Sequence, residues 1–135
     1  MAQTLNVQPA DLADVLELLD LAGSAKADTT LGAATMAELC RDTLAFSVDA
    51  DGERLAAYAI KVVNHENERV AWVMAAGGGM RGVDLTATVL PAIEYQAQQL
   101  NAGQIAITTR RRGLIHKLSA MGYTVAGITL RKNIK

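Results

Sequence analysis

Apolar and polar positions in the first third of the chain follow two different periods, which predict a strand and then two helices. Apolar residues alternate with polar ones over residues 4–8, as in a short strand. They recur at helical spacing over residues 12–22, and we place Pro9 in the first turn of this helix, where proline is tolerated. A second helix is predicted over residues 31–44.

The middle of the chain has the period of two that is typical of strands. We predict strands over residues 45–50, 55–63 and 69–76, the last around Trp72. Asp51-Gly52 lies between the first two and is a strong signal for a tight hairpin turn. The three strands therefore form a meander.

The last third begins with a glycine-rich loop over residues 77–82. A helix is predicted over residues 84–100, with Asp84 as its N-cap and with Leu85, Val89 and Ile93 on its buried face. Pro91 lies inside this helix and should kink or split it. A strand over 104–109, a helix over 111–121 and a final strand over 123–131 complete the predicted order β-α-α-β-β-β-α-β-α-β.

Composition indicates one globular domain over residues 1–135. Half of the 135 residues are hydrophobic, 20% are charged and the net charge is −1, so a disordered chain is excluded. The single cysteine, Cys40, cannot form an intramolecular disulfide, and no metal-ligand spacing is present. The longest apolar stretch is too short to span a membrane, and the first residues show no signal-peptide pattern, so we expect a cytoplasmic protein.

The small net charge hides a strong asymmetry along the chain. Residues 1–68 carry twelve acidic and four basic residues, whereas residues 69–135 carry two acidic and nine basic ones. Such a division is typical of a surface that binds an anion, unless the two halves interleave in the fold and neutralise each other. No aromatic residue lies among Arg110, Arg111 and Arg112 to stack on bases, so nucleic-acid binding is not expected.

The predicted order of elements resembles that of the GNAT superfamily, the GCN5-related N-acetyltransferases, over essentially the whole chain. The glycine-rich loop after the fourth strand, the sequence Asn101-Ala102-Gly103 before the fifth, and residues 113–123 (GLIHKLSAMGY) carry the resemblance. It implies an α/β fold in which a mixed, mostly antiparallel central sheet of about six strands has helices on both faces.

The resemblance also implies a site for acetyl-CoA in a V between the fourth and fifth strands. Backbone N–H groups around Val73, Met74 and Ala75 would polarise the thioester carbonyl. The pyrophosphate would meet the N–H groups at the start of the following helix, where glycines let it approach the backbone. The residues expected there are Gly77, Gly78, Gly79, Met80, Arg81, Gly82, Arg111 and Arg112.

The sequence departs from the family pattern at two places. The family motif Q/R-x-x-G-x-G/A aligns with Gly77, Met80 and Gly82, of which only the last matches. Leu118 stands where the family often has a tyrosine that acts as general acid. Two functions therefore stay open. One is an N-acetyltransferase that moves the acetyl group of acetyl-CoA to a primary amine on a small molecule or a protein. The other is a non-catalytic structural or interaction protein of the phage or prophage type, associated with the virion.

Three residues are candidates for proton transfer, each with a simpler alternative. His116 could act as a base or an acid, or could be a surface histidine on a short helix. Tyr123 could donate a proton or fill an aromatic core position, and Glu68 could be a base or a solvated surface acid. Assembly of identical chains is left open.

Overall fold

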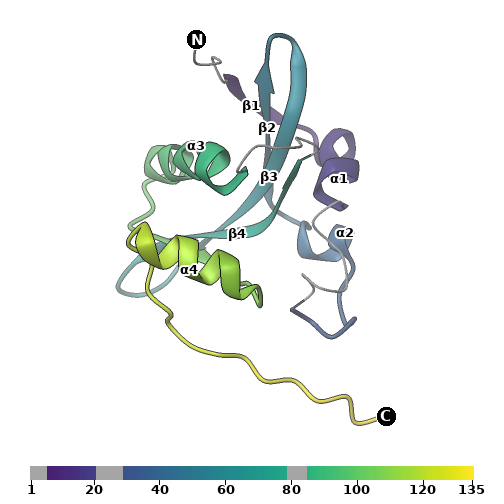
Figure 1. The fold of residues 1–135 in the computed structure, drawn as a ribbon, viewed down its shortest axis with the longest axis vertical. Helices are drawn as coiled ribbons and strands as arrows, with labels where there is room; N and C mark the ends of the chain where they lie inside the picture. Colours follow the sequence, from purple (N-terminus) through teal and green to yellow (C-terminus); the bar gives the residue numbers. More distant parts are fainter. Residues whose placement is uncertain (1–5, 21–28, 79–84) are drawn as a thin grey trace.

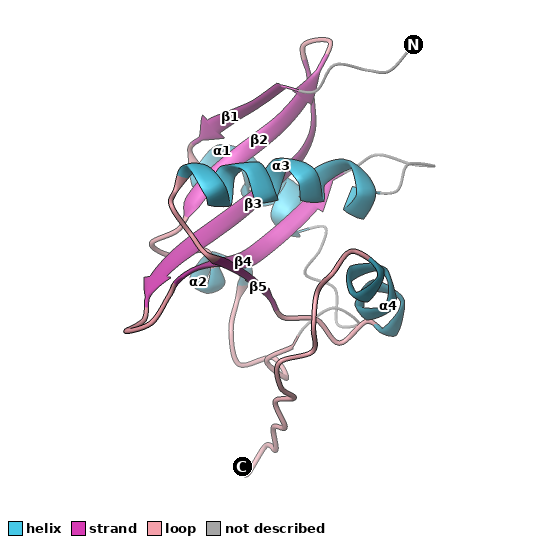
Figure 2. Cartoon of the chain, turned by 90° about the vertical axis from the view of Figure 1, so that its left-hand side faces the viewer, coloured by secondary structure: helices cyan, strands magenta, loops and turns pink. Residues whose placement is uncertain are grey.

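The computed structural model describes residues 6–20, 29–78 and 85–135 of the chain. In this part, five strands form one sheet in the order β1-β2-β3-β4-β5, antiparallel from β1 to β4 and parallel between β4 and β5 (Figures 1 and 2). The predicted α/β class with a mixed, mostly antiparallel sheet is confirmed, with five strands in place of about six. The elements are β1 (Asn6–Ala10), α1 (Leu12–Asp20), α2 (Met36–Leu39), β2 (Leu44–Ala50), β3 (Glu53–Asn64), β4 (Arg69–Gly78), α3 (Leu85–Gln99), β5 (Gln104–Ile107) and α4 (Arg112–Ala120).

Helices cover both faces of the sheet, as predicted. Helices α1 and α2 lie on one face, and α3 and α4 lie on the other (Figures 1 and 2). Val89 and Ile93 of α3 are buried against the sheet, as expected, whereas Trp72 is only partly buried. Among the described helices, none is long and apolar enough to cross a lipid bilayer.

Each face has its own hydrophobic core. The core under α3 contains Phe46, Tyr58 and Ile60 from the sheet together with Leu118 from α4. The rings of Phe46 and Tyr58 stack with their centroids 5.2 Å apart. The core under α1 is built mainly from small residues of the sheet, which let the helix approach closely. Its buried members are Val15, Leu19, Cys40, Ala45, Ala57, Ala59 and Ala75.

The hairpin between β2 and β3 forms at the predicted turn. Ala50 pairs with Glu53, and the two residues between them, Asp51 and Gly52, have φ values of 52° and 77°. Two consecutive left-handed residues match the right-handed twist of the flanking strands, which is why Asp-Gly is favoured here.

The first two helices differ from the prediction for reasons of backbone geometry. Pro9 belongs to β1, opposite Phe46, rather than to the first turn of α1. Proline is tolerated there because β1 is the edge strand of the described sheet. The second helix covers Met36–Leu39 instead of residues 31–44, because Leu31 and Gly32 have φ values of 52° and 79°, which no α-helix contains.

Helix α3 agrees closely with the predicted range of 84–100. It runs as one continuous helix although Pro91 lies inside it, so the predicted split does not occur. Pro91 is exposed. The predicted N-cap, Asp84, lies outside the described residues.

The predicted final strand over residues 123–131 does not form. Tyr123 packs against the core under α3, but the chain after it is extended, exposed and directed away from the sheet (Figures 1 and 2). The pattern for a strand is present, yet a strand needs a hydrogen-bonded neighbour, and no described strand pairs with these residues. We call residues 124–135 the C-terminal tail.

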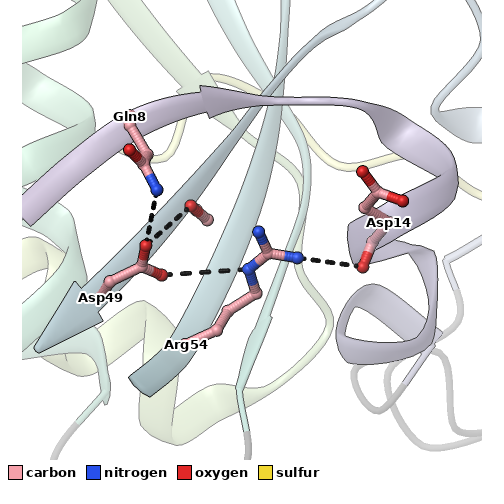
Figure 3. A network of polar contacts seen from close by, with 5 residues as sticks. Gln8, Asp14, Asp49 and Arg54 are labelled. Carbon is pink, nitrogen blue, oxygen red and sulfur yellow. Dashed lines mark hydrogen bonds and ion pairs between the residues drawn. The ribbon is translucent and has the colours of Figure 1, made fainter. Parts of the chain in front are cut away.

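A polar network lies at the β1 edge of the sheet (Figure 3). Asp49 on β2 accepts a hydrogen bond of 2.8 Å from the Gln8 side chain on β1 and lies 3.9 Å from the Arg54 guanidinium on β3. Arg54 also donates to the backbone carbonyl of Asp14 at 3.2 Å. The network therefore joins three strands to α1.

Candidate functional site

Strand β4 contains a β-bulge at Met74. Ile60 of β3 pairs with Val73, but its neighbour Ala59 pairs with Ala75, so Met74 has no partner of its own on β3. A bulge adds one residue to one strand, bends that strand and increases its local twist.

The bulge changes which side chains face which core. Ala71 and Val73 belong to the core under α3, as does Ile60 opposite Val73. Ala75 would lie on that same face in a regular strand, but it is buried in the core under α1. Ala76 points to the α3 side instead, opposite Tyr58.

Strands β4 and β5 separate at the same level. Their parallel pairing runs from Val70 opposite Gln104 to Val73 opposite Ile107 and ends there, while β4 continues to Gly78. The segment of β4 from Met74 onward therefore has no described strand beside it on the β5 side. This separation is the V that the sequence analysis anticipated.

A cleft of about 530 Å³ occupies this opening. Its floor is the end of β4, one wall is α3, and the other wall is the end of β5 with α4. Most of the lining is apolar. The lining residues are Val73, Ala76, Gly77, Thr86, Val89, Leu90, Ile93, Ile107, Arg111, Gly113, Leu114, Lys117 and Leu118.

Among the described residues, two cationic side chains line the cleft, and both come from the α4 region. Arg111 is the N-cap residue of α4, and Lys117 lies in its last turn. Arg112 follows Arg111 by about 100° around the helix axis and does not line the cleft. Of the two arginines expected at the site, Arg111 therefore lines the cleft with Gly77, and Arg112 does not.

The expected glycine-rich loop is described only in part. Gly77 and Gly78 belong to β4, and residues 79–82 (Gly79, Met80, Arg81 and Gly82) lie outside the described residues. Gly78 is required by close packing, because a Cβ atom there would lie 2.6 Å from the carbonyl oxygen of Leu55. Gly78 therefore allows β4 to pack closely against β3.

Two of the candidates for proton transfer lie away from the cleft. His116 is exposed on α4 and does not line it. The Glu68 carboxylate accepts a hydrogen bond of 3.0 Å from the backbone N–H of Arg69 and packs against Gly103. It lies at the end of β4 where the strands are still paired, not at the end where they separate.

Tyr123 is also held outside the cleft. Its hydroxyl donates a hydrogen bond of 3.4 Å to the Glu94 carboxylate. Tyr123 also lines a second cavity, of about 280 Å³, together with Gln104 and Ile105 of β5. Burial, followed by the charge of Glu94 and its hydrogen bond, raises the pKa of Tyr123 to about 12. A hydroxyl with this pKa holds its proton at neutral pH.

Leu118 occupies the position that the resemblance assigns to a general acid. Its side chain is buried and lines the cleft. Among the described residues, the titratable side chains that line the cleft are Arg111 and Lys117. Sequence reasoning missed Lys117, Leu114 and Thr86, although the helical period of α4 places the first two one turn apart on one face.

Comparisons with known proteins identify the fold. No protein-family model matches the sequence, and it matches no curated protein. Solved structures do match over nearly the whole chain. Glucosamine-6-phosphate N-acetyltransferase from Arabidopsis thaliana is 14% identical, with a TM-score of 0.64 over 98% of this chain and 100% of that one. The fold is the GNAT fold.

Two further solved structures share the fold. Ribosomal-protein-alanine N-acetyltransferase from Brucella melitensis is 16% identical, with a TM-score of 0.62 over 98% of this chain and 99% of that one. An aminoglycoside N-acetyltransferase in complex with CoA is 11% identical, with a TM-score of 0.60 over 98% of this chain and 97% of that one. The similarity lies in the fold, since these identities are low.

Proposed function

We propose that this chain binds acetyl-CoA in the cleft between β4 and β5 and transfers the acetyl group to a primary amine. The observation that carries the proposal is the separation of the two strands at the Met74 bulge, which leaves the end of β4 without a neighbour. Structures with the same fold are N-acetyltransferases by name, and one of them was solved with CoA.

The residues of the cleft fit the two chemical halves of such a molecule. The backbone of β4 after Val73 has N–H and C=O groups on its open side, which can pair with the amides of an extended pantetheine chain as a neighbouring strand would. Arg111, which lines the cleft with Gly77, supplies a cation for the phosphates. The apolar lining, including Val89 and Ile93, excludes water from the acyl end.

The chain's own contribution to transfer is binding, orientation and polarisation. When bound, acetyl-CoA supplies an acetyl group on a thioester. Backbone N–H groups of Val73, Met74 and Ala75 are the donors that we assign to the thioester carbonyl. Because the bulge takes Met74 out of the ladder with β3, this segment has a backbone geometry that a regular strand lacks.

Leu118 favours a second candidate function, namely binding without transfer. A buried leucine at this position cannot protonate a leaving thiolate, and neither His116 nor Glu68 reaches the cleft. In that case the domain would use the cleft to recognise acyl-CoA, whereas a structural or interaction protein of the phage or virion type would need no CoA.

Two measurements separate the possibilities. Binding of CoA to the folded state must raise the melting temperature, so a shift that grows with CoA concentration supports the cleft. The absence of a shift at saturating CoA would refute both acetyl transfer and CoA binding, and would leave a structural or interaction role that needs no CoA. Release of free thiol from acetyl-CoA with a panel of primary amines then tests transfer, and binding without thiol release would favour the second candidate.

A further inference from the structure

The C-terminal tail combines a strand-like sequence with almost complete exposure. Val125, Ile128, Leu130 and Ile134 have exposed fractions of 60%, 83%, 89% and 89%. Residues 124–130 are rich in β-branched and small residues and contain no charge. Large apolar side chains gathered on one exposed segment mark an interaction site rather than an ordinary surface.

Strand β5 offers the complementary surface. Within the described part of the chain it pairs only with β4, so its other edge presents unpaired backbone groups. Its sequence, Gln-Ile-Ala-Ile, carries no proline or charged residue that would block pairing with an added strand. An open edge and an unpaired apolar strand are the two halves of a β-augmentation contact.

Charge argues against pairing of the tail with β5 of its own chain. Tyr123, just before the tail, lines a cavity with Gln104 at the start of β5. A tail that followed β5 from there would run parallel to it. Its basic end, which contains Arg131, Lys132 and Lys135, would then approach residues 110–112, three consecutive arginines. Like charges at this distance oppose the arrangement.

An antiparallel tail from a second copy has the opposite charge relationship. Its apolar part would lie along β5, and its basic end would continue past Gln104 toward Glu68 and Glu94. The Glu68 carboxylate packs against Gly103, directly before β5, and Glu94 lines the cavity that contains Gln104. Both carboxylates therefore lie at the end of β5 that the basic residues would reach.

We propose that residues 124–132 of one copy add to the sheet of a second copy as an antiparallel strand on β5, and that the exchange is reciprocal. A two-fold axis then relates the two copies, so the same contact between tail and β5 forms twice. Both tails and both β5 edges are covered in this way. The direction of the tail, which leaves its own sheet, agrees with this arrangement (Figure 2).

Sedimentation velocity over a range of concentrations tests the proposal with a matched pair of variants. Ile128→Asp places a charge in the apolar part of the tail, and Ile134→Asp makes the same change beyond it. Both side chains are exposed in the single chain, so neither change should disturb its fold. We expect a dimer whose dissociation constant rises about tenfold or more with Ile128→Asp and stays within about threefold with Ile134→Asp. A wild-type chain that stays monomeric at submillimolar concentration would overturn the proposal, as would equal effects of the two variants.

Disulfide trapping distinguishes exchange from folding back within one chain. In a Cys40→Ala background, one chain carries Gln104→Cys and a second carries Thr129→Cys, with Ala126→Cys and Arg131→Cys as alternative tail positions. Exchange predicts that oxidation of the mixture joins the two different chains at one tail position at least. A chain that carries both cysteines is oxidised in parallel. If the disulfide forms only within that chain, and not between the two different chains, the tail pairs with its own β5 and the proposal is wrong.

Discussion

Arg111 at the start of α4 and Gly77 at the end of β4 line the same cleft, although one belongs to a helix terminus and the other to a strand. The cleft lies between them because the pairing of β4 with β5 ends at Val73. A cation and a free strand edge thus line the same mostly apolar cleft, and this relationship gives the most direct test of ligand binding.

Arg111→Ala should weaken the binding of CoA, because it removes a charge-assisted contact to a phosphate. The loss of a hydrogen bond to a charged group corresponds to about tenfold or more in the dissociation constant. Arg112→Ala is the matched control, since Arg112 is the adjacent arginine and does not line the cleft. Calorimetric titration with CoA measures both, and equal losses would show that binding depends on general charge rather than on the cleft.

Gly78→Ala should destabilise the fold by about 1–3 kcal/mol, because the new methyl group would overlap the Leu55 carbonyl oxygen and force β3 and β4 apart. Gly113→Ala is the comparison, because a Cβ there meets no atom within 4 Å. It should be neutral or stabilising by up to about 1 kcal/mol, since alanine favours the helix. Urea unfolding at equilibrium measures the free energy of unfolding of each variant.

Ile93→Ala should lower the free energy of unfolding by roughly 2–5 kcal/mol, the usual cost of removing a buried isoleucine side chain. Gln98→Ala, an exposed position on the same helix, should change it by less than about 0.5 kcal/mol. A neutral result for Ile93→Ala would contradict the packing of α3 on the sheet.

Tyr123 should make stability fall at high pH. Its pKa is about 12 in the folded chain, above the ordinary tyrosine value of 10.0, so the unfolded chain loses this proton first. The contribution of Tyr123 to stability is therefore intact below pH 10 and is lost as the pH rises toward 12. Burial also raises the pKa of Tyr58, so part of the fall belongs to that residue.

The difference between the wild type and Tyr123→Phe isolates the contribution of Tyr123. Urea unfolding at a series of pH values between 9 and 12 should give a shallower fall for Tyr123→Phe. Glu94→Gln should give an intermediate slope, because it removes the charge that raises the pKa while leaving Tyr123 buried. Identical slopes for all three proteins would mean that Tyr123 is not held as described.

Local signals in the sequence predicted the elements whose geometry is decided locally. The turn at Asp51-Gly52 follows from two residues that accept a left-handed backbone, and the buried face of α3 follows from its helical period. Pro9 was misplaced because its fixed φ suits both a helix start and an edge strand, and only the pairing with Phe46 decides between them.

The candidate site was harder to predict, because its parts depend on long-range geometry. Nothing in the alternation of residues 69–76 marks Met74 as the bulged position. The choice between Arg111 and Arg112 depends on where α4 begins, which a sequence pattern fixes only to within a few residues. The predicted strand after Tyr123 has the right composition. Whether a neighbouring strand pairs with it depends on the rest of the fold, which the sequence of this segment does not encode.

The bulge at Met74 means that the cleft depends on a count of residues more than on their identities. Substitutions along β4 would alter the walls, but the bulge, which puts Val73 and Ala75 on opposite faces of the sheet, needs one extra residue in the strand. Deleting Met74 would place Ala75 directly after Val73 in a regular ladder with β3, so the later side chains of β4 would keep their faces while the bend and the extra twist at this point would be lost. Chains that share little sequence can therefore inherit the same cleft, provided that the length of this one strand is kept.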